Sequence, residues 1–265
     1  MMKKRKKHMG KSCSKIILLI LILAAWIVVT VRAKKTEEGI ILTDAYKKQI
    51  MESAEWKKIF LHTENYPDIL LEDLKRNPEM LEFVEGYNDV HKKSSEGLTF
   101  EERKKKVPLF IQWDKRWGYA PYGNSNIGIS GCAPTCLSMV IVGLTANKKA
   151  TPYQVAKFAE EKGYYMEGTG TAWSIMTEGA ASFGITGEEI PLSKEKIVSC
   201  LNAGKPIICS MKPGNFTTEG HFIVLTGTSD GKIKVNDPNS RARSKLWDYE
   251  TIEGQIKNLW AFNKN

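Results

Sequence analysis

Histidine and cysteine are scarce in this chain. Its 265 residues contain four histidines, and only His221 follows residue 91. The five cysteines include no CxxC pair, so the sequence offers neither a disulfide scaffold nor a structural zinc site. Cys200 and Cys209 are expected to be buried free thiols, with a bridge between them as the alternative. Any histidine-dependent chemistry in the second half of the chain must use His221.

Acidic residues are absent from the N-terminal 35 positions. Those positions hold ten of the 39 Lys and Arg and none of the 30 Asp and Glu, so the remainder has 29 basic and 30 acidic residues. The net charge of +9 therefore describes a basic tail and not a basic body. No basic stripe with interleaved aromatic residues follows, which excludes a nucleic-acid-binding domain as the main function.

The basic tail leads into an uncharged run that is typical of a membrane anchor. Residues 16–31 carry no charge, and snorkelling Lys15 and Arg32 extend them toward the roughly 17–25 residues of a membrane helix. Seven Lys or Arg precede the run and three closely follow it, which favours a cytoplasmic N-terminus. We expect a cytoplasmic tail over 1–15, a signal-anchor helix over 16–32 and a body outside a bacterial cell. The alternative is a signal peptide cleaved near residue 33, which would make the protein secreted.

Residues 36–106 are expected to form a helical juxtamembrane region that ends in a linker. A first helix should run to about Phe60, and two shorter ones should follow. The residues that favour helix starts are Thr43 or Asp44, Pro67 and Pro78. The charge run over 101–106 predicts a solvated linker.

The composition changes at residue 107, where a separate α+β domain is expected over 107–265. The sequence of its first half favours helices, and the sequence of its second half contains short segments typical of β-strands. The expected helices are 132–144, 151–162, one that contains Trp173 and Met176, and 193–202. The expected strands are 206–211, 221–227, 232–235 and 259–262. A domain of this length is of normal size.

Cys132 is a candidate nucleophile because it stands at the expected start of a helix. The thiolate is the reactive form of cysteine, and the partial positive charge of a helix N-terminus favours an anion there. Gly131 before it would allow a substrate backbone to approach closely. A buried structural cysteine is the alternative interpretation, and it is the one we adopt for Cys136 one turn later.

His221 and Asp237 are candidate partners of Cys132. A neutral imidazole at the start of a strand can take the thiol proton and later protonate the leaving amine. A carboxylate sixteen residues on can orient that imidazole. Asn236 is the alternative orienting residue, and a simple turn is the alternative interpretation of this Asn-Asp-Pro segment. Gln112 is a candidate oxyanion-hole donor, together with the main-chain N–H of Cys132.

A series of motifs in fixed order resembles the C39-like peptidase family, a papain-like group related to bacteriocin-processing peptidases. The resemblance covers nearly all of 107–265 and nothing before it. The motifs are Gln112-x-Asp114-x-Arg116-Trp117, Tyr122-Gly123, Gly131-Cys132-x-Pro134-Thr135, Thr151-Pro152, Gly168-x-Gly170-Thr171-x-Trp173, Gly220-His221-Phe222-Ile223-Val224-Leu225 and Val235-Asn236-Asp237-Pro238.

The resemblance implies a papain-like fold and a role for each candidate residue. Cys132 would be the nucleophile, His221 the base, Asp237 the orienting acid and Gln112 part of the oxyanion hole, with no metal or cofactor. The bacteriocin peptidases place their glutamine only a few residues before the cysteine, whereas the gap here is twenty residues. They also precede transporter domains, and this sequence has none, so cleavage after a double-glycine leader is not implied.

Two classes of function remain open at this stage. The first is a membrane-anchored cysteine peptidase that acts on peptides or proteins outside the cell, with an acyl or peptidyl transferase as a close variant. The second is a non-catalytic surface module that binds peptide or cell-wall material in the same cleft.

Overall fold

The computed structural model describes residues 48, 50–88 and 97–265, which belong to one compact unit that spans Ile41–Asn265. The tail predicted over 1–15 and the anchor predicted over 16–32 lie outside the described residues. Among the described residues, no helix is both long and apolar enough to cross a bilayer.

Residues 48, 50 and 51 are helical, and three short α-helices follow within residues 54–88, which we call the helical segment. They are α3 (Ala54–Leu61), α4 (Asp68–Arg76) and α5 (Leu81–Glu85), with a 3-10 turn, η2 (Pro78–Met80), before the last. The helix predicted to run to about Phe60 is interrupted by a turn, because the Ser53 side chain accepts a hydrogen bond from the Trp56 N–H and caps α3. Pro67 and Pro78 stand at the starts of α4 and η2, as predicted.

The helical segment shares a hydrophobic core with the beginning of the α+β domain. Leu70, Leu71 and Leu74 form the buried face of α4. They belong to one cluster with Phe83 of α5 and with three residues of the domain, Ile111, Trp113 and Tyr119. The ring of Tyr119 stacks on Phe83 at 4.4 Å between centroids, and its hydroxyl donates to the Phe83 carbonyl.

The linker prediction over 101–106 was wrong, because part of this charge run is a capped helix. Helix α6 (Phe100–Lys104) begins with a capping box in which Thr99 and Glu102 bond each other's main-chain N–H groups. Glu102 also pairs with Arg116 at 2.6 Å, and that arginine is held by Asp114 at 2.8 Å. The sequence pattern showed the charges but not the partner that orders them.

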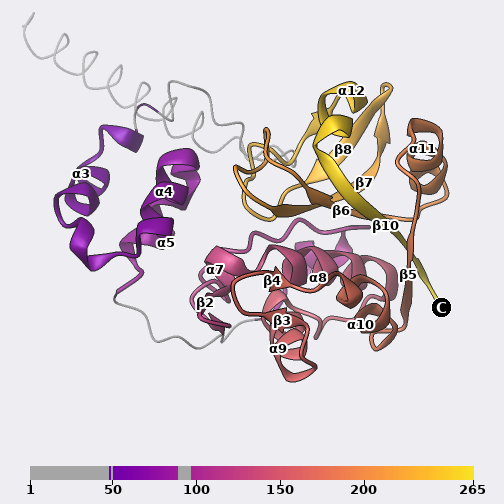
Figure 1. Ribbon diagram of the computed structural model, residues 1–265, viewed down its shortest axis with the longest axis horizontal. Helices are drawn as coiled ribbons and strands as arrows, with labels where there is room; N and C mark the ends of the chain where they lie inside the picture. Colours follow the sequence, from indigo (N-terminus) through magenta and orange to yellow (C-terminus); the bar gives the residue numbers. More distant parts are fainter. Residues whose placement is uncertain (1–47, 49, 89–96) are drawn as a thin grey trace, which may run out of the picture. The chain divides into compact units, whose positions relative to one another are not determined.

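A six-stranded antiparallel sheet forms the centre of the domain (Figure 1). Its order is β5-β10-β6-β7-β8-β9. The strands are β5 (Ile185–Glu189), β6 (Ile207–Met211), β7 (His221–Ser229), β8 (Lys232–Asn236), β9 (Leu246–Trp247) and β10 (Ile256–Lys264). The four predicted strands are confirmed with small shifts of their ends, and β5 and β9 were not predicted.

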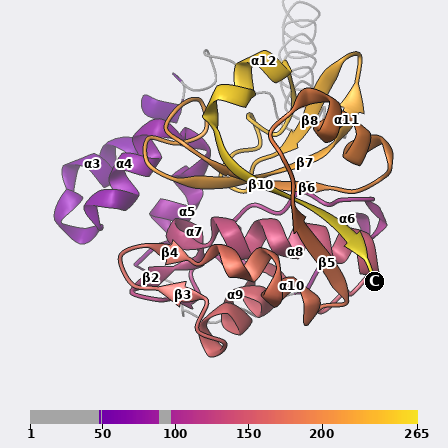
Figure 2. The ribbon, with the colours of Figure 1, turned by 45° about the vertical axis from the view of Figure 1, so that its right-hand side comes forward.

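Helices cover both faces of the sheet. They are α7 (Ile127–Ser130), α8 (Cys132–Thr145), α9 (Pro152–Glu161), α10 (Glu178–Ala181), α11 (Lys194–Asn202) and α12 (Tyr249–Ile252). Figure 2 shows α8, α9 and α10 on one side of the sheet and α12 on the other. The sequence predicted α8, α9 and α11, and the side chains of Thr151 and Ser193 cap the last two of them. The prediction of a mixed α and β domain is confirmed.

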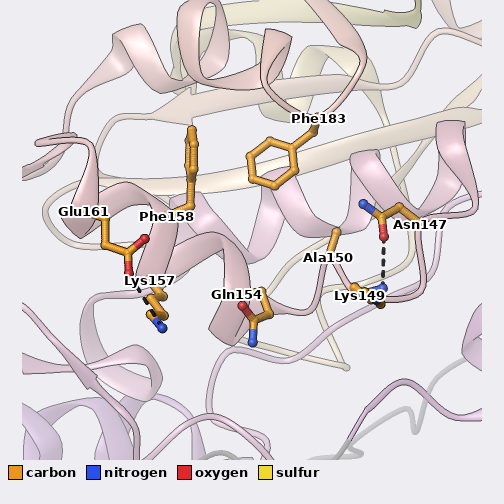
Figure 3. A pocket seen from close by; sticks show the side chains of 8 residues that line it. All are labelled: Asn147, Lys149, Ala150, Gln154, Lys157, Phe158, Glu161 and Phe183. Carbon is orange, nitrogen blue, oxygen red and sulfur yellow. Dashed lines mark hydrogen bonds and ion pairs between the residues drawn. The ribbon is translucent and has the colours of Figure 1, made fainter.

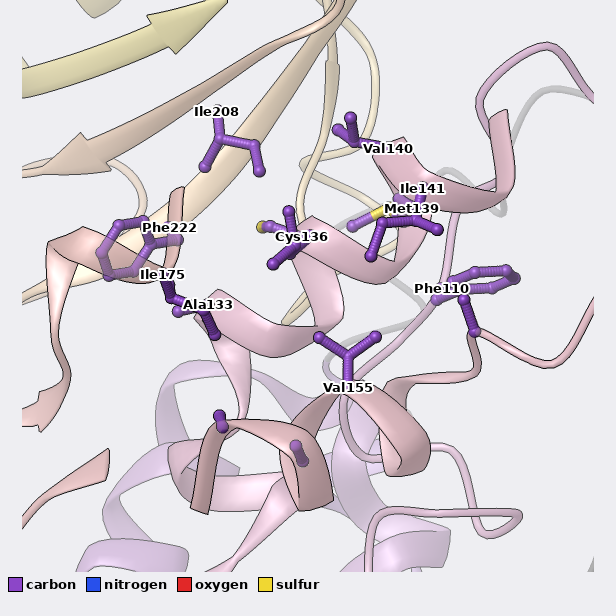
Figure 4. Close-up of a cluster of buried hydrophobic side chains, with 14 of the residues drawn as sticks. Phe110, Ala133, Cys136, Met139, Val140, Ile141, Val155, Ile175, Ile208 and Phe222 are labelled. Atoms are coloured by element: carbon purple, nitrogen blue, oxygen red, sulfur yellow. The ribbon is translucent and has the colours of Figure 1, made fainter. Parts of the chain in front are cut away.

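The larger core lies between α8 and the sheet. Cys136 of α8 is fully buried there, next to residues of the sheet such as Ile208 and Phe222 (Figure 4). The opposite face of the sheet packs on α11 and α12 and buries Cys200 and Cys209. All four cysteines in the described part of the chain are free thiols, as the sequence favoured. This core fixes α8 against the sheet, and the position of the first residue of α8 follows from it.

Candidate active site

Cys132 is the first residue of α8, and this helix end is open. Its N-cap residue, Gly131, supplies no side-chain hydrogen bond, whereas side chains of Thr151 and Ser193 cap α9 and α11. The first N–H groups of a helix lack partners within it, and the helix dipole favours an anion there. The partly exposed Cys132 thiol therefore lies where both a thiolate and a substrate oxyanion are stabilised.

Gly131 is required by packing inside the protein. A Cβ atom at this position would lie 2.5 Å from the main-chain oxygen of Ile127 and 2.6 Å from its Cγ2. Close contact between α7 and the start of α8 thus accounts for the glycine, where the sequence had suggested an approaching substrate.

We expect Gly131→Ala to destabilise the protein by about 1–3 kcal/mol, because the added methyl group has no room against the α7 backbone. Thermal or urea unfolding measures the loss. Gly254→Ala is the matched control, since a Cβ there meets nothing within 4 Å. Equal stability of the two variants would contradict the packing explanation.

His221 opens β7 and is buried, with 6% of its surface exposed. It pairs in register with Met211 at the end of β6. Its Nε2 atom lies 2.8 Å from Oδ1 of Asp237, and the carboxylate can only accept, so Nε2 donates. This bond leaves Nδ1 as the other ring nitrogen, and Cys132 lies near enough to the imidazole to influence its pKa.

Asp237 directly follows β8, and its side chain is completely buried. Oδ1 also accepts from the Asn239 N–H at 2.8 Å, and Oδ2 accepts from Nε of Arg243 at 2.6 Å. Burial works against a charged carboxylate, but the positive charges of His221 and Arg243 outweigh it and hold the pKa of Asp237 below its ordinary value. The group is thus an anion fixed in one orientation.

The residue that meets the imidazole is Asp237 and not Asn236. The Asn236 amide donates to the main-chain oxygens of Val107 and Pro108 at 3.4 and 3.2 Å, which directs it into the core. The two neighbours alternate in direction because they lie at a strand end, where successive side chains point to opposite faces.

The imidazole carries a positive charge at neutral pH. Burial by itself would lower the pKa of His221, but the charge and hydrogen bond of Asp237, with smaller contributions from the Cys132 thiol, raise it to about 9. An imidazolium next to a sulfur favours the thiolate, and it holds the proton that a leaving amine needs. The site can therefore support nucleophilic attack by sulfur followed by proton donation.

Gln112 lies beneath the turn that leads into Cys132, and it is buried. Its amide nitrogen donates to the main-chain oxygens of Gly128 at 2.9 Å and Ile129 at 3.3 Å. Its Oε1 atom has no hydrogen-bond partner in the described part of the chain. An amide nitrogen has two hydrogens, so Gln112 can donate to an oxyanion only by giving up one of these bonds. Its assignment to the oxyanion hole stays a prediction.

Sequence reasoning missed Arg243. This residue fixes the second oxygen of Asp237, and its side chain is mostly buried. The available signal was a basic side chain six residues after the acid, in a turn-rich segment that folds back on itself. A second arginine, Arg241, lies nearer in sequence, four residues after Asp237, but stacks on Trp113, so the sequence alone does not select the partner.

A cavity of ≈ 640 Å³ opens beside His221. One wall comes from the hairpin and turn over 166–174, and the other comes from the strand ends over 210–220, including Gly220. Trp173 is 39% exposed in this wall, and Nζ of Lys257 lies 5.4 Å from its ring centroid. The size is that of a typical ligand pocket.

A smaller cavity of ≈ 290 Å³ lies between α9, the loop before it and Phe183 (Figure 3). Its walls include Phe158 and the ion pair of Lys157 with Glu161. None of the candidate site residues lines either cavity, but the wall of the larger one includes Gly220, the residue before His221. No cluster of three or more potential metal ligands occurs among the described residues.

Comparisons with known proteins give one family match. Residues 104–264 match the model of the Peptidase_C39 like family. A comparison with curated proteins gave no match.

Three solved structures are similar to this chain. The peptidase domain of Streptococcus ComA, described as a bi-functional ABC transporter of a quorum sensing pathway, is 16% identical, with 50% of this chain and 93% of that chain covered and a TM-score of 0.37. A protein from Bacillus anthracis described as a C39-like peptidase is 16% identical, with 64% and 99% covered and a TM-score of 0.40. A double glycine motif protease from an AMS/PCAT transporter, in complex with a leader peptide, is 17% identical, with 64% and 100% covered and a TM-score of 0.38.

Proposed function

The chain belongs to the C39-like peptidase family, and we propose that it is a cysteine peptidase with Cys132 as nucleophile, His221 as general base and acid, and Asp237 as the orienting carboxylate. One observation carries this proposal. One buried imidazole bonds Asp237 at 2.8 Å and lies near enough to Cys132 for the thiol to influence its pKa.

The proposed reaction has two steps, acylation of Cys132 and hydrolysis of the resulting thioester. The Cys132 thiolate attacks the peptide carbonyl carbon, a C–S bond forms, and one electron pair of the C=O bond moves to oxygen. When this intermediate collapses, the C–N bond breaks and the amine leaves with the proton from Nδ1 of His221. Water then attacks the thioester and gives a proton to His221, and the C–S bond breaks to release the acid and restore the thiolate.

The oxyanion of each step would lie at the N-terminus of α8. The N–H of Cys132 is the first donor because the helix does not use it. We assign the second donor to Gln112, which would release its longer bond to Ile129 when substrate binds. The peptide chain would lie in the ≈ 640 Å³ cavity, with its backbone close to Gly220 and its side chains against Trp173.

The N-terminal residues complete the proposal. A cytoplasmic tail over 1–15 and a signal-anchor over 16–32 would hold the peptidase outside the cell membrane. The supporting observation is the distribution of Lys and Arg around an uncharged run. A cleaved signal peptide would instead release it, and mass spectrometry of the mature N-terminus separates the two.

We expect iodoacetamide to alkylate Cys132 at least about tenfold faster at pH ~6 in the wild-type protein than in His221→Gln, because the imidazolium maintains the thiolate. Peptide mapping after timed labelling measures the rate. Cys136, whose pKa is raised by burial, serves as the internal unreactive cysteine. If Cys132 reacts no faster than Cys136, or equally fast without His221, the proposed mechanism is excluded. Product analysis with an added amine then separates hydrolysis from transfer.

A further inference from the structure

The helical segment contacts the loop that precedes His221 and the loop that follows Asp237, although the family match begins only at residue 104. We call residues 237–244 the acid loop, because it begins with Asp237 and contains its partner Arg243. The structure describes the helical segment and the acid loop as parts of one compact unit. Their contacts are polar as well as apolar.

Glu79 of η2 is the centre of this contact. Its Oε1 atom accepts from the Ser240 hydroxyl at 2.5 Å and from the Ala242 N–H at 3.2 Å. Its Oε2 atom accepts from the Arg241 N–H at 3.0 Å. One carboxylate thus binds three donors of the acid loop, and hydrogen bonds to a charged acceptor are the strong ones.

Neighbouring residues fix the same loop and the loop before His221. The Asn77 amide and the Trp113 indole both donate to the Asn239 carbonyl, the latter at 3.0 Å. Arg76 of α4 donates to the Thr218 hydroxyl at 2.6 Å, three residues before His221. Asp73 on the same helix lies near enough to His221 for the two charges to interact.

A continuous series of bonds joins Glu79 to the imidazole. The Ser240 hydroxyl that donates to Glu79 also accepts from the Arg243 N–H at 3.1 Å. The Arg243 side chain then holds Asp237, which holds His221. Each group in the series has a partner on both sides, so the orientation of Asp237 depends on where the acid loop is fixed.

We infer that Glu79 is a positioning residue for the peptidase site: by fixing the acid loop through Ser240, Arg241 and Ala242, it holds Asp237 against His221. The inference gives the helical segment a role in catalysis, and it rests on the proposed function. Glu79 contacts neither the substrate cavity nor Cys132, so it acts only through the acid loop.

The test compares Glu79→Gln with Glu82→Gln in the full chain. In Glu79→Gln, the side-chain NH₂ group faces donors of the acid loop and cannot accept hydrogen bonds from them. Glu82 is the control because its side chain is 84% exposed and forms an ion pair with Lys115 at 3.4 Å. We expect kcat/KM of Glu79→Gln to fall by up to about 100-fold, mainly in kcat, because the reacting groups lose alignment. The ratio of the Cys132 alkylation rate at pH ~6 to the rate at pH ~9 should also fall in Glu79→Gln. Glu82→Gln should match the wild type in both.

Ser240→Ala provides an independent variant, since it removes only the hydroxyl that joins Glu79 to Arg243. Its effect and that of Glu79→Gln should be less than multiplicative in the double variant, because both break one series. All rates are measured at temperatures where circular dichroism shows each variant folded. Loss of stability with unchanged kcat and alkylation ratio, or fully multiplicative effects, would overturn the inference. A wild-type protein without an activated Cys132 would overturn the proposed function instead.

Discussion

Replacing Cys132 with alanine is expected to lower kcat/KM for peptide hydrolysis by about 10⁶. No other cysteine of the described residues can substitute. Cys136 lies one turn deeper in α8, is fully buried, and has its pKa raised well above the ordinary value by that burial. The other two described thiols lie on the far face of the sheet. Hydrolysis of an unbiased peptide library, followed by mass spectrometry, measures the loss and gives the cleavage preference of the wild type.

Cys136→Ala is the matched control for this variant. It removes the same atoms from the same helix, and we expect it to lower stability by about 1–3 kcal/mol through a small cavity while kcat/KM stays near that of the wild type. Full function of Cys132→Ala in cells would contradict the peptidase proposal. It would favour a protein that binds peptide in the cavity beside Gly220 without cleaving it.

Replacing Asp237 with asparagine is expected to lower kcat/KM by about 10³–10⁴. An amide accepts through only one oxygen, so it cannot serve both His221 and Arg243, and the imidazole loses its fixed tautomer. Arg243 is left mostly buried without its counter-charge, and breaking a buried ion pair in this way costs about 3–5 kcal/mol. Kinetics and urea unfolding measure the two effects separately. Asp248→Asn is the control, because that residue forms an exposed ion pair with Lys232.

The same variant has a defined pH dependence. In the folded wild type the pKa of His221 rises from 6.5 to about 9, so this contribution to stability is full below pH ~6.5 and is lost as the pH rises through about 9. Asp237 has a lowered pKa, so its contribution is present above pH ~4 and is lost on further acidification. The stability difference between wild type and Asp237→Asn should therefore be largest between pH ~4 and ~6.5. The alkaline limb of kcat/KM should also move to lower pH in the variant.

A difference in stability that stays constant from pH ~4 to ~10 would contradict this assignment of the charges. So would an unchanged alkaline limb, since it would show that another group than His221 controls activity at high pH. Thermal unfolding of both proteins over that range, with rates measured in the same buffers, provides the comparison.

Local signals predicted the helices of the domain better than its sheet edges. Thr151 and Ser193 cap α9 and α11 through bonds to residues three positions on, so the sequence contains the whole interaction. Strand β5 has the polar sequence Thr-Gly-Glu-Glu after Ile185 and is paired only with β10, about seventy residues later. Helix α6 was missed although its capping box, Thr99 with Glu102, is local, and its tertiary partner Arg116 could not be read from the charge run.

The candidate site was predictable to the extent that its residues are rare or stand next to element ends. His221 was identified because no other histidine follows residue 91, and Cys132 because it begins a helix. The structure pairs His221 with Asp237 and places Cys132 near enough to influence the pKa of the imidazole, while the catalytic roles of all three stay predictions. Arg243 and Glu79 could not be found in this way, because ordinary surface residue types gain their significance only from tertiary contacts.

The contact between the helical segment and the acid loop shows that the family match and the compact structural unit begin at different residues. The match to the family model begins at residue 104, whereas the compact unit begins at Ile41 and includes Asn77 and Glu79. A chain trimmed to the family-matched residues 104–264 would expose the apolar surface of Ile111 and Trp113. The main-chain N–H groups of Arg241 and Ala242 would then bond to water instead of to Glu79. The family-matched portion by itself therefore lacks Asn77 and Glu79, the two residues that bond the acid loop from the helical segment.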